Sequence, residues 1–142
     1  MQTPSDEAWN NFVMQSDPGA FAQDTSERAA AIANLFMGVT SNGGLSHFLE
    51  STYDLDAAET VDALHVVGAH GASSQLQEVI SGLAIALPPM SQDDRWNALQ
   101  EHWKGRLDDL DTLSSEAEDE LMAALTRHVL EREAFYRQLG RS

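Results

Sequence analysis

Carboxylates are the most numerous of the side chains in this sequence that could do chemistry. The 142 residues hold 23 acids and 8 Lys or Arg, for a formal net charge of −15. Between Arg28 and Arg95 there is no Lys or Arg at all. Such a surface repels nucleic acid and anionic membranes and attracts cationic proteins. The charge therefore predicts a basic protein partner, no nucleic acid and no membrane; solubility alone is the competing explanation.

The first candidate site is a row of acids on an expected helix over 57–69. At about 100° per residue, one face of this helix is small or apolar and is expected to face the core. That face consists of Ala57, Val61, Leu64 and Gly68. The remaining face holds acids and one apolar side chain, so the predicted partner-binding residues are Asp54, Asp56, Glu59, Asp62 and Val66. A solvated helix face with one stray valine would give the same pattern.

A second candidate site lies within residues 108–120, which contain seven acids and no base. Three of these acids fall in the first turn of an expected helix, where the helix dipole favours anions. Three others, Asp108, Asp109 and Asp111, precede that helix and have no such local reason. Because closely spaced like charges repel one another, a cationic partner would stabilise them. We therefore predict that they also bind a partner.

Catalytic patterns are weak by comparison. His47 and Glu50 stand at i and i+3 and could face one metal ion, but two ligands do not make a site, and no HExxH or G-x-S-x-G motif is present. The chain has no cysteine. His128 and Arg132 lie on the apolar face of the last expected helix, which favours structural roles for both. We therefore predict no catalytic residue, metal or cofactor.

The elements that would position these residues are all helical. Apolar residues recur at helical spacing throughout, and no segment alternates as a strand would. The prediction is one all-α domain, compact and acidic, over residues 1–142, with about seven helices. The expected helices span 6–15, about 25–37, 45–51, 57–69, Ser73 or Ser74 to Pro88, 91–105, and 115–139.

An Asn42-Gly43-Gly44 turn separates two of these helices. A glycine-rich turn before a helix can bind phosphate through free backbone N–H groups. Here the Lys and Ser/Thr of a phosphate-binding loop are absent, and the surroundings are acidic. The turn is therefore predicted to be a tight corner, since Gly and Asn reach positive φ at little cost.

This turn also begins a family resemblance. "VTSNGGLSHFLES", followed by "AAETVDALHVVGAHGASSQLQEVI", resembles the signature of a bacterial DNA-mimic protein family, and the likeness extends over about residues 27–137. The resemblance implies an all-helical protein, forming a homodimer in the best-known member, that presents carboxylates to a DNA-binding protein as DNA presents phosphates. Leu45 departs from the pattern, because an aromatic residue usually follows the glycines.

Three functional hypotheses follow. The first is a non-enzymatic binding protein that mimics DNA and occupies the basic surface of a DNA-binding protein or transcription regulator. The second is an immunity or antitoxin-like inhibitor of a basic toxin, which would use the same acids. The third is a small metal-dependent enzyme built on His47 and Glu50. With no basic n-region and no apolar segment at the N-terminus, a cytoplasmic location is expected.

Overall fold

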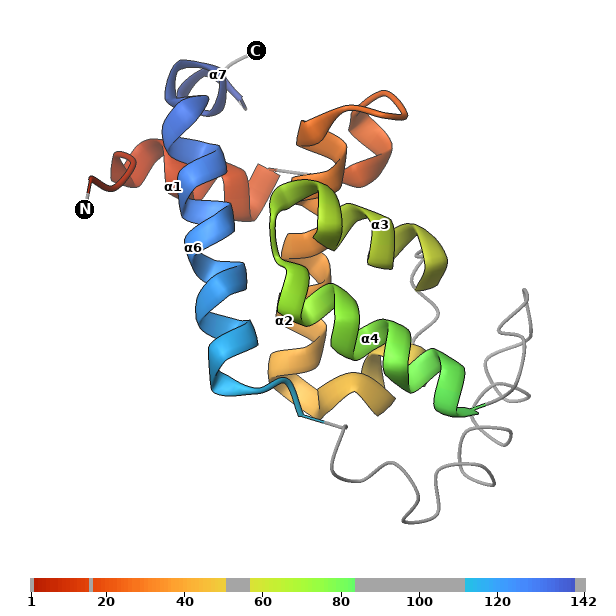
Figure 1. The fold of residues 1–142 in the computed structure, drawn as a ribbon. Helices are drawn as coiled ribbons and strands as arrows, with labels where there is room; N and C mark the ends of the chain where they lie inside the picture. The colour runs from red at the N-terminus through yellow and green to blue at the C-terminus, as the bar shows by residue number, and fades with distance from the viewer. Residues whose placement is uncertain (1, 16, 51–56, 84–111, 140–142) are drawn as a thin grey trace.

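A computed structural model describes residues 2–15, 17–50, 57–83 and 112–139, and these residues are helical with no strand among them. The predicted all-α fold is confirmed, since the described ranges hold six α-helices and one 3-10 helix. The helix expected over 91–105 lies outside these ranges. The elements are α1 Asp6–Gln15, the 3-10 helix η1 Pro18–Ala20, α2 Ser26–Glu50, α3 Ala57–Val67, α4 His70–Leu83, α6 Ser115–Glu131 and α7 Glu133–Gln138 (Figure 1). Within the described ranges, no helix is long and apolar enough to cross a membrane.

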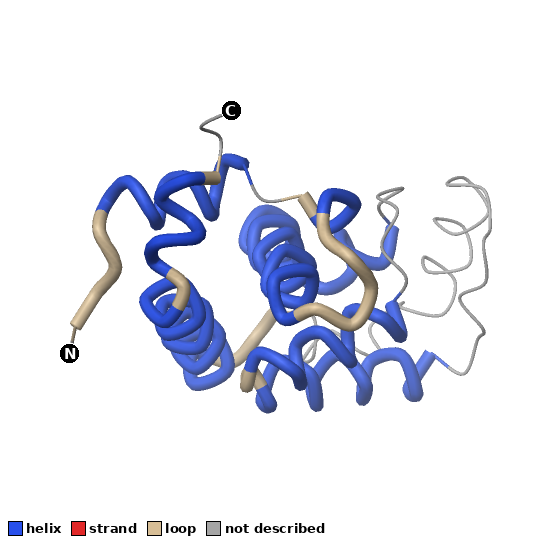
Figure 2. Tube along the Cα trace, turned by 90° about the horizontal axis from the view of Figure 1, so that it is seen from above, coloured by secondary structure: helices blue, strands red, loops and turns tan. Residues whose placement is uncertain are grey.

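Two long helices form the centre of the fold. α2 and α6 run side by side in opposite directions, and Figure 2 shows both nearly end-on. The hairpin of α3 and α4 packs across them, while α1 packs on α7 at one end (Figure 1). The core between these layers is aliphatic and aromatic, and it includes Phe12, Phe36, Leu64, Leu121 and Tyr136, all fully buried.

Side-chain hydroxyls cap three helices. Ser5, Thr25 and Ser114 accept hydrogen bonds from the backbone N–H groups three residues further on, at 3.3, 3.2 and 3.1 Å respectively. Each bond satisfies an amide that has no partner within its own helix. Ser5 and Thr25 directly precede the two helices that were expected over 6–15 and about 25–37. Ser114 caps α6, whose first residue, Ser115, is where the sequence predicted this helix to begin.

The Asn-Gly-Gly segment does form a corner, and Gly44 makes it. Gly44 has φ 78° and ψ −171°, a conformation essentially restricted to glycine, and it separates two helical arms of α2. Leu45 and Phe48 beyond it are buried as predicted, and the ring of Phe48 packs edge-on against Phe36 at 5.1 Å between centroids. The predicted helix end near residue 37 is wrong, because buried Val39 continues the apolar face to the corner.

The turn between α3 and α4 is also made by a glycine. Gly68 has φ 96°, and the N–H of Ala69 donates to the carbonyl of Leu64 at 2.8 Å, which closes α3. α4 begins at His70 and not at Ser73 or Ser74 as predicted. Its start is stabilised from another helix, since the Gly71 N–H donates to Oε1 of Glu120 on α6 at 2.6 Å. Ser73 instead donates its hydroxyl hydrogen to the Val61 carbonyl at 2.9 Å.

The predicted single helix over 115–139 is broken at Arg132, whose φ of −123° and ψ of 32° separate α6 from α7. The break folds Tyr136 back onto the core, where its hydroxyl lies 2.7 Å from Nε2 of His128. Tyr136 also packs edge-on against Phe12 of α1 at 5.3 Å between centroids. The break therefore allows α7 to hold α1 against the rest of the domain.

Candidate partner-binding face

The outward face of α3 holds the described part of the first candidate site. Asp62 is exposed and Val66 is 61% exposed, as the helical pattern predicted. The inward face is wider than predicted. Leu64 is fully buried, but so is Thr60, and Ala63 is nearly so. An acid and a large apolar side chain thus lie one turn apart on a surface that no described element covers.

Glu59, on the same helix, is not a free carboxylate. Nη2 and Nε of Arg28 both donate to its Oε1, at 2.7 and 3.0 Å. Nη1 of Arg28 also donates to the Pro18 carbonyl at 2.6 Å. Arg28 therefore ties the first turn of α2 to both α3 and η1. Sequence reasoning missed this role, although Arg28 is the one base in the first 94 residues.

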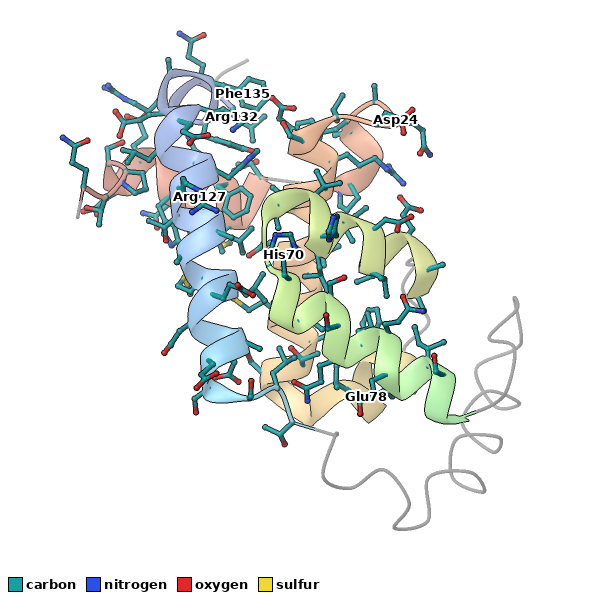
Figure 3. All side chains as sticks on the ribbon, in the orientation of Figure 1. Asp24, His70, Glu78, Arg127, Arg132 and Phe135 are labelled. Atoms are coloured by element: carbon teal, nitrogen blue, oxygen red, sulfur yellow. The ribbon has the colours of Figure 1, made fainter. Side chains whose placement is uncertain are left out.

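Beside this ion pair lies a groove of about 500 Å³ between the start of α2 and α3. Its walls combine apolar surface from Ile32 and Val66 with the carboxylates of Asp24, Glu59 and Asp62. Asp24 lies where the chain enters α2 (Figure 3) and has a positive φ of 65°. Asp24 was not among the predicted site residues. Arg28 lines the groove as well, paired with Glu59, so Asp24 and Asp62 are the carboxylates of the groove outside that pair. Carboxylates beside apolar surface suit the cationic head and aliphatic stem of Lys or Arg.

The rest of the predicted partner-binding set cannot be placed. Asp54 and Asp56 precede α3, and Asp108, Asp109 and Asp111 precede α6, all outside the described residues. Their partner-binding role stays a prediction. The acids that follow Asp111 are described, and Glu120 among them has a structural role at the start of α4.

His128 and Arg132 have the structural environments that were predicted. His128 is 6% exposed and hydrogen-bonded to Tyr136. Burial, aided by the Arg132 guanidinium and opposed by Glu27, lowers the pKa of His128 to about 4. Burial also raises the pKa of the Tyr136 hydroxyl. Arg132 pairs with Glu27 at 3.5 Å and donates to the Ser26 hydroxyl at 3.0 Å.

The metal hypothesis receives no support from the described side chains, among which no three His, Cys, Asp or Glu gather closely enough to hold an ion. His47 and Glu50 lie on the second arm of α2, and their side chains are outside what the structure describes. The same holds for the side chain of Asn42.

An acidic, all-helical protein with an exposed carboxylate face is the class that the fold and the site define. The sequence matches the model of the DMP19-like protein family over residues 22–133, so the chain belongs to that family. DMP19 is a family of DNA mimic proteins and is not known as an enzyme family. No curated protein and no solved structure matches the chain. That the Asn-Gly-Gly and Gly-Ala segments are the family's signature stays a prediction.

Proposed function

We propose that this protein acts by binding and not by catalysis, and that it occupies the DNA-binding surface of a basic protein as a mimic of DNA. Family membership and the charge of −15 support this proposal. The observation that supports it most directly is the α3 groove, whose lining includes exposed Asp24, Asp62 and Val66.

The spacing of the groove's acids suits the imitation of phosphates. Acids three or four residues apart on one helix have Cβ atoms roughly 5–6 Å apart, and the exposed acids Asp24 and Asp62 line one groove from two elements. A DNA strand presents one phosphate about every 3.4 Å of helix axis, so side chains spread over neighbouring turns can approximate such a row. In this proposal Asp24 and Asp62 contact the partner's Lys or Arg, and Val66 packs on an apolar side chain between them.

Arg28 limits what Glu59 can contribute. The pair with Arg28 neutralises much of the Glu59 charge, and both donors go to Oε1. We therefore assign Glu59 to shaping the groove and Asp62 to contacting the partner. Asp54, Asp56, Asp108, Asp109 and Asp111 would extend the acidic surface. A homodimer and a cytoplasmic location, expected from the sequence, complete the proposal.

Capture of partners from a bacterial lysate at low salt, followed by elution in a salt gradient and mass spectrometry, tests the proposal. The test variant is Asp62→Asn with Val66→Ala. The matched control is Glu78→Gln, which removes one exposed acid from α4, away from the groove (Figure 3). A further variant replaces Asp108, Asp109 and Asp111 with Asn.

The proposal predicts a basic DNA-binding protein that elutes at moderate salt, is retained by the Glu78→Gln control and is lost from the Asp62 and Val66 variant. A partner that resists salt and binds all variants equally would contradict it. A single toxin-like enzyme among the retained proteins would instead favour the inhibitor hypothesis.

A further inference from the structure

A second cavity, of about 320 Å³, lies between the α3–α4 turn and α6 and differs in charge from the rest of the molecule. Two arginines and three histidines line it, together with one acid, in a protein of net charge −15. These residues are Arg127, Arg132, His65, His70, His128 and Glu131.

Among the described side chains, Arg127 is the arginine of this cavity that has no carboxylate partner. Of the four arginines that the structure describes, Arg28, Arg132 and Arg137 each have a carboxylate within 4 Å. Arg127 has no such partner among the described side chains, and it is exposed. Arg readily forms two hydrogen bonds to a carboxylate or phosphate. The guanidinium of Arg127, which has no carboxylate partner among the described side chains, can therefore bind an anionic ligand.

The α3–α4 turn places two histidines beside Arg127. Nδ1 of His65 lies 3.1 Å from Nδ1 of His70, and the ring centroids are 4.7 Å apart. Nη2 of Arg127 lies 3.1 Å from where a Cβ on Gly68 would stand, so the guanidinium approaches the backbone of this turn. Figure 3 shows Arg127 on α6 and His70 at the start of the neighbouring α4. Three potential donor groups from three elements therefore meet at one cavity.

The nearby acids already have partners. Glu131 lies 3.6 Å from Nη1 of Arg132, and Glu120 accepts the Gly71 N–H. Glu27, from α2, pairs with Arg132 at 3.5 Å. His128 is buried and bonded to Tyr136. Arg127 and the His65–His70 pair thus remain to act on a ligand.

We propose that this cavity binds a small oxyanion, the phosphate or carboxylate group of a ligand. Arg127 donates to it. The two histidine Nδ1 atoms share one hydrogen bond at 3.1 Å in the structure, and when both rings are protonated each Nδ1 donates to the anion instead. A metal ion fits less well, because only two ligands are present and Arg127 repels a cation. The site adjoins the acidic α3 groove, because Val66 lines both, but its donors Arg127, His65 and His70 line this cavity and not the groove. The proposal does not depend on the function proposed for the groove.

Titration of the full chain with inorganic phosphate, and separately with acetate, tests the site. The ring signals of His65 and His70 are followed by NMR at pH 6.0 and 7.5, with sodium chloride holding the ionic strength constant. We expect a saturable shift of both rings, with tighter binding at pH 6.0. Saturation by phosphate would identify a phosphate site, and saturation by acetate alone a carboxylate site.

Arg127→Gln is expected to weaken binding at least about tenfold, as the loss of a charge-assisted hydrogen bond should. The matched control is Arg137→Gln, which removes an exposed arginine on α7 and should leave binding unchanged. His70→Gln should weaken binding as well, and circular dichroism confirms that each variant is folded. The proposal would be overturned if the ring signals shifted without saturating for both anions. Equal binding of the anion by Arg127→Gln and the wild type would overturn it as well.

Discussion

Arg28 and Glu59 join α2 to α3 through two hydrogen bonds to one carboxylate oxygen, at 2.7 and 3.0 Å. The arginine side chain is 18% exposed and the glutamate 37%, so this pair is only partly screened by water. It forms one wall of the acidic groove and fixes how α3 is presented. Of the two acids of α3, Glu59 therefore supports the fold, whereas Asp62 is exposed and can bind a partner.

Glu59→Gln should therefore destabilise the protein, and Asp62→Asn should not. Removing the charge of Glu59 weakens a half-buried ion pair, which we expect to lower the free energy of unfolding by about 1 kcal/mol. Asp62 is exposed, so its variant should stay within about 0.5 kcal/mol of the wild type. Urea unfolding measures the free energy of unfolding of both variants. An equal decrease in the two variants would contradict a structural role for Glu59 that Asp62 does not share.

Two glycines of α2 should respond in opposite directions to alanine. Gly44 has φ 78° and ψ −171°, so Gly44→Ala forces a strained backbone and should cost about 1–3 kcal/mol. Gly38 lies in the helical first arm, and an added Cβ would meet nothing within 4 Å. Gly38→Ala should therefore stabilise the protein by about 0.5–1 kcal/mol. Thermal unfolding of the two variants measures these changes in stability. If Gly44→Ala were as stable as the wild type, the strained backbone at Gly44 would be contradicted.

His128 should make the protein less stable in mild acid. Its pKa in the folded protein is lowered to about 4, against 6.5 in the unfolded chain. The unfolded state therefore binds a proton between these values that the folded state does not, so the free energy of unfolding falls as the pH falls through this window. At pH 5 the loss from this group should be about 2 kcal/mol, and it should vanish above pH 7.

Other acids also titrate in this range, so the comparison is made against His128→Gln. The difference in the free energy of unfolding between wild type and variant, measured in urea at pH 7.5 and pH 5, should shift by about 2 kcal/mol in favour of the variant. A difference that does not change with pH would show that His128 takes up its proton equally in both states.

Binding to the partner should depend on Asp62 and Val66 separately. Each single variant, Asp62→Asn or Val66→Ala, should weaken the affinity for the captured partner by about tenfold, the usual scale for a contact at the centre of an interface. Only the Asp62 contribution should fall as salt is raised, because salt screens charges and not apolar contacts. Calorimetry at two salt concentrations measures both effects, with Glu78→Gln as the neutral control.

Local patterns in the sequence predicted much of the fold. Helical spacing of apolar residues placed α1 correctly and the start of α2 to within one residue. Glycine chemistry predicted the corner that Gly44 makes. These features depend on a few neighbouring residues, which is why they can be inferred without the fold.

What the sequence did not predict depends on residues far apart in the chain. α4 begins three residues earlier than expected because Glu120, 49 positions away, accepts the Gly71 N–H. Glu59 is paired because Arg28, 31 positions away, reaches it. The charge pattern of α3 placed Asp62 and Val66 on the exposed face, but only the packing of α2 on α3 shows the groove beside them.

The central claim is that this protein occupies the surface with which its partner binds DNA. The most direct measurement is competition: duplex DNA labelled with a fluorophore is bound to the captured partner, and this protein is added while anisotropy is followed. We predict that the wild type and Glu78→Gln displace the DNA at the same concentration, and that Asp62→Asn with Val66→Ala requires a much higher one. A complex in which the partner holds DNA and this protein at once would contradict the claim.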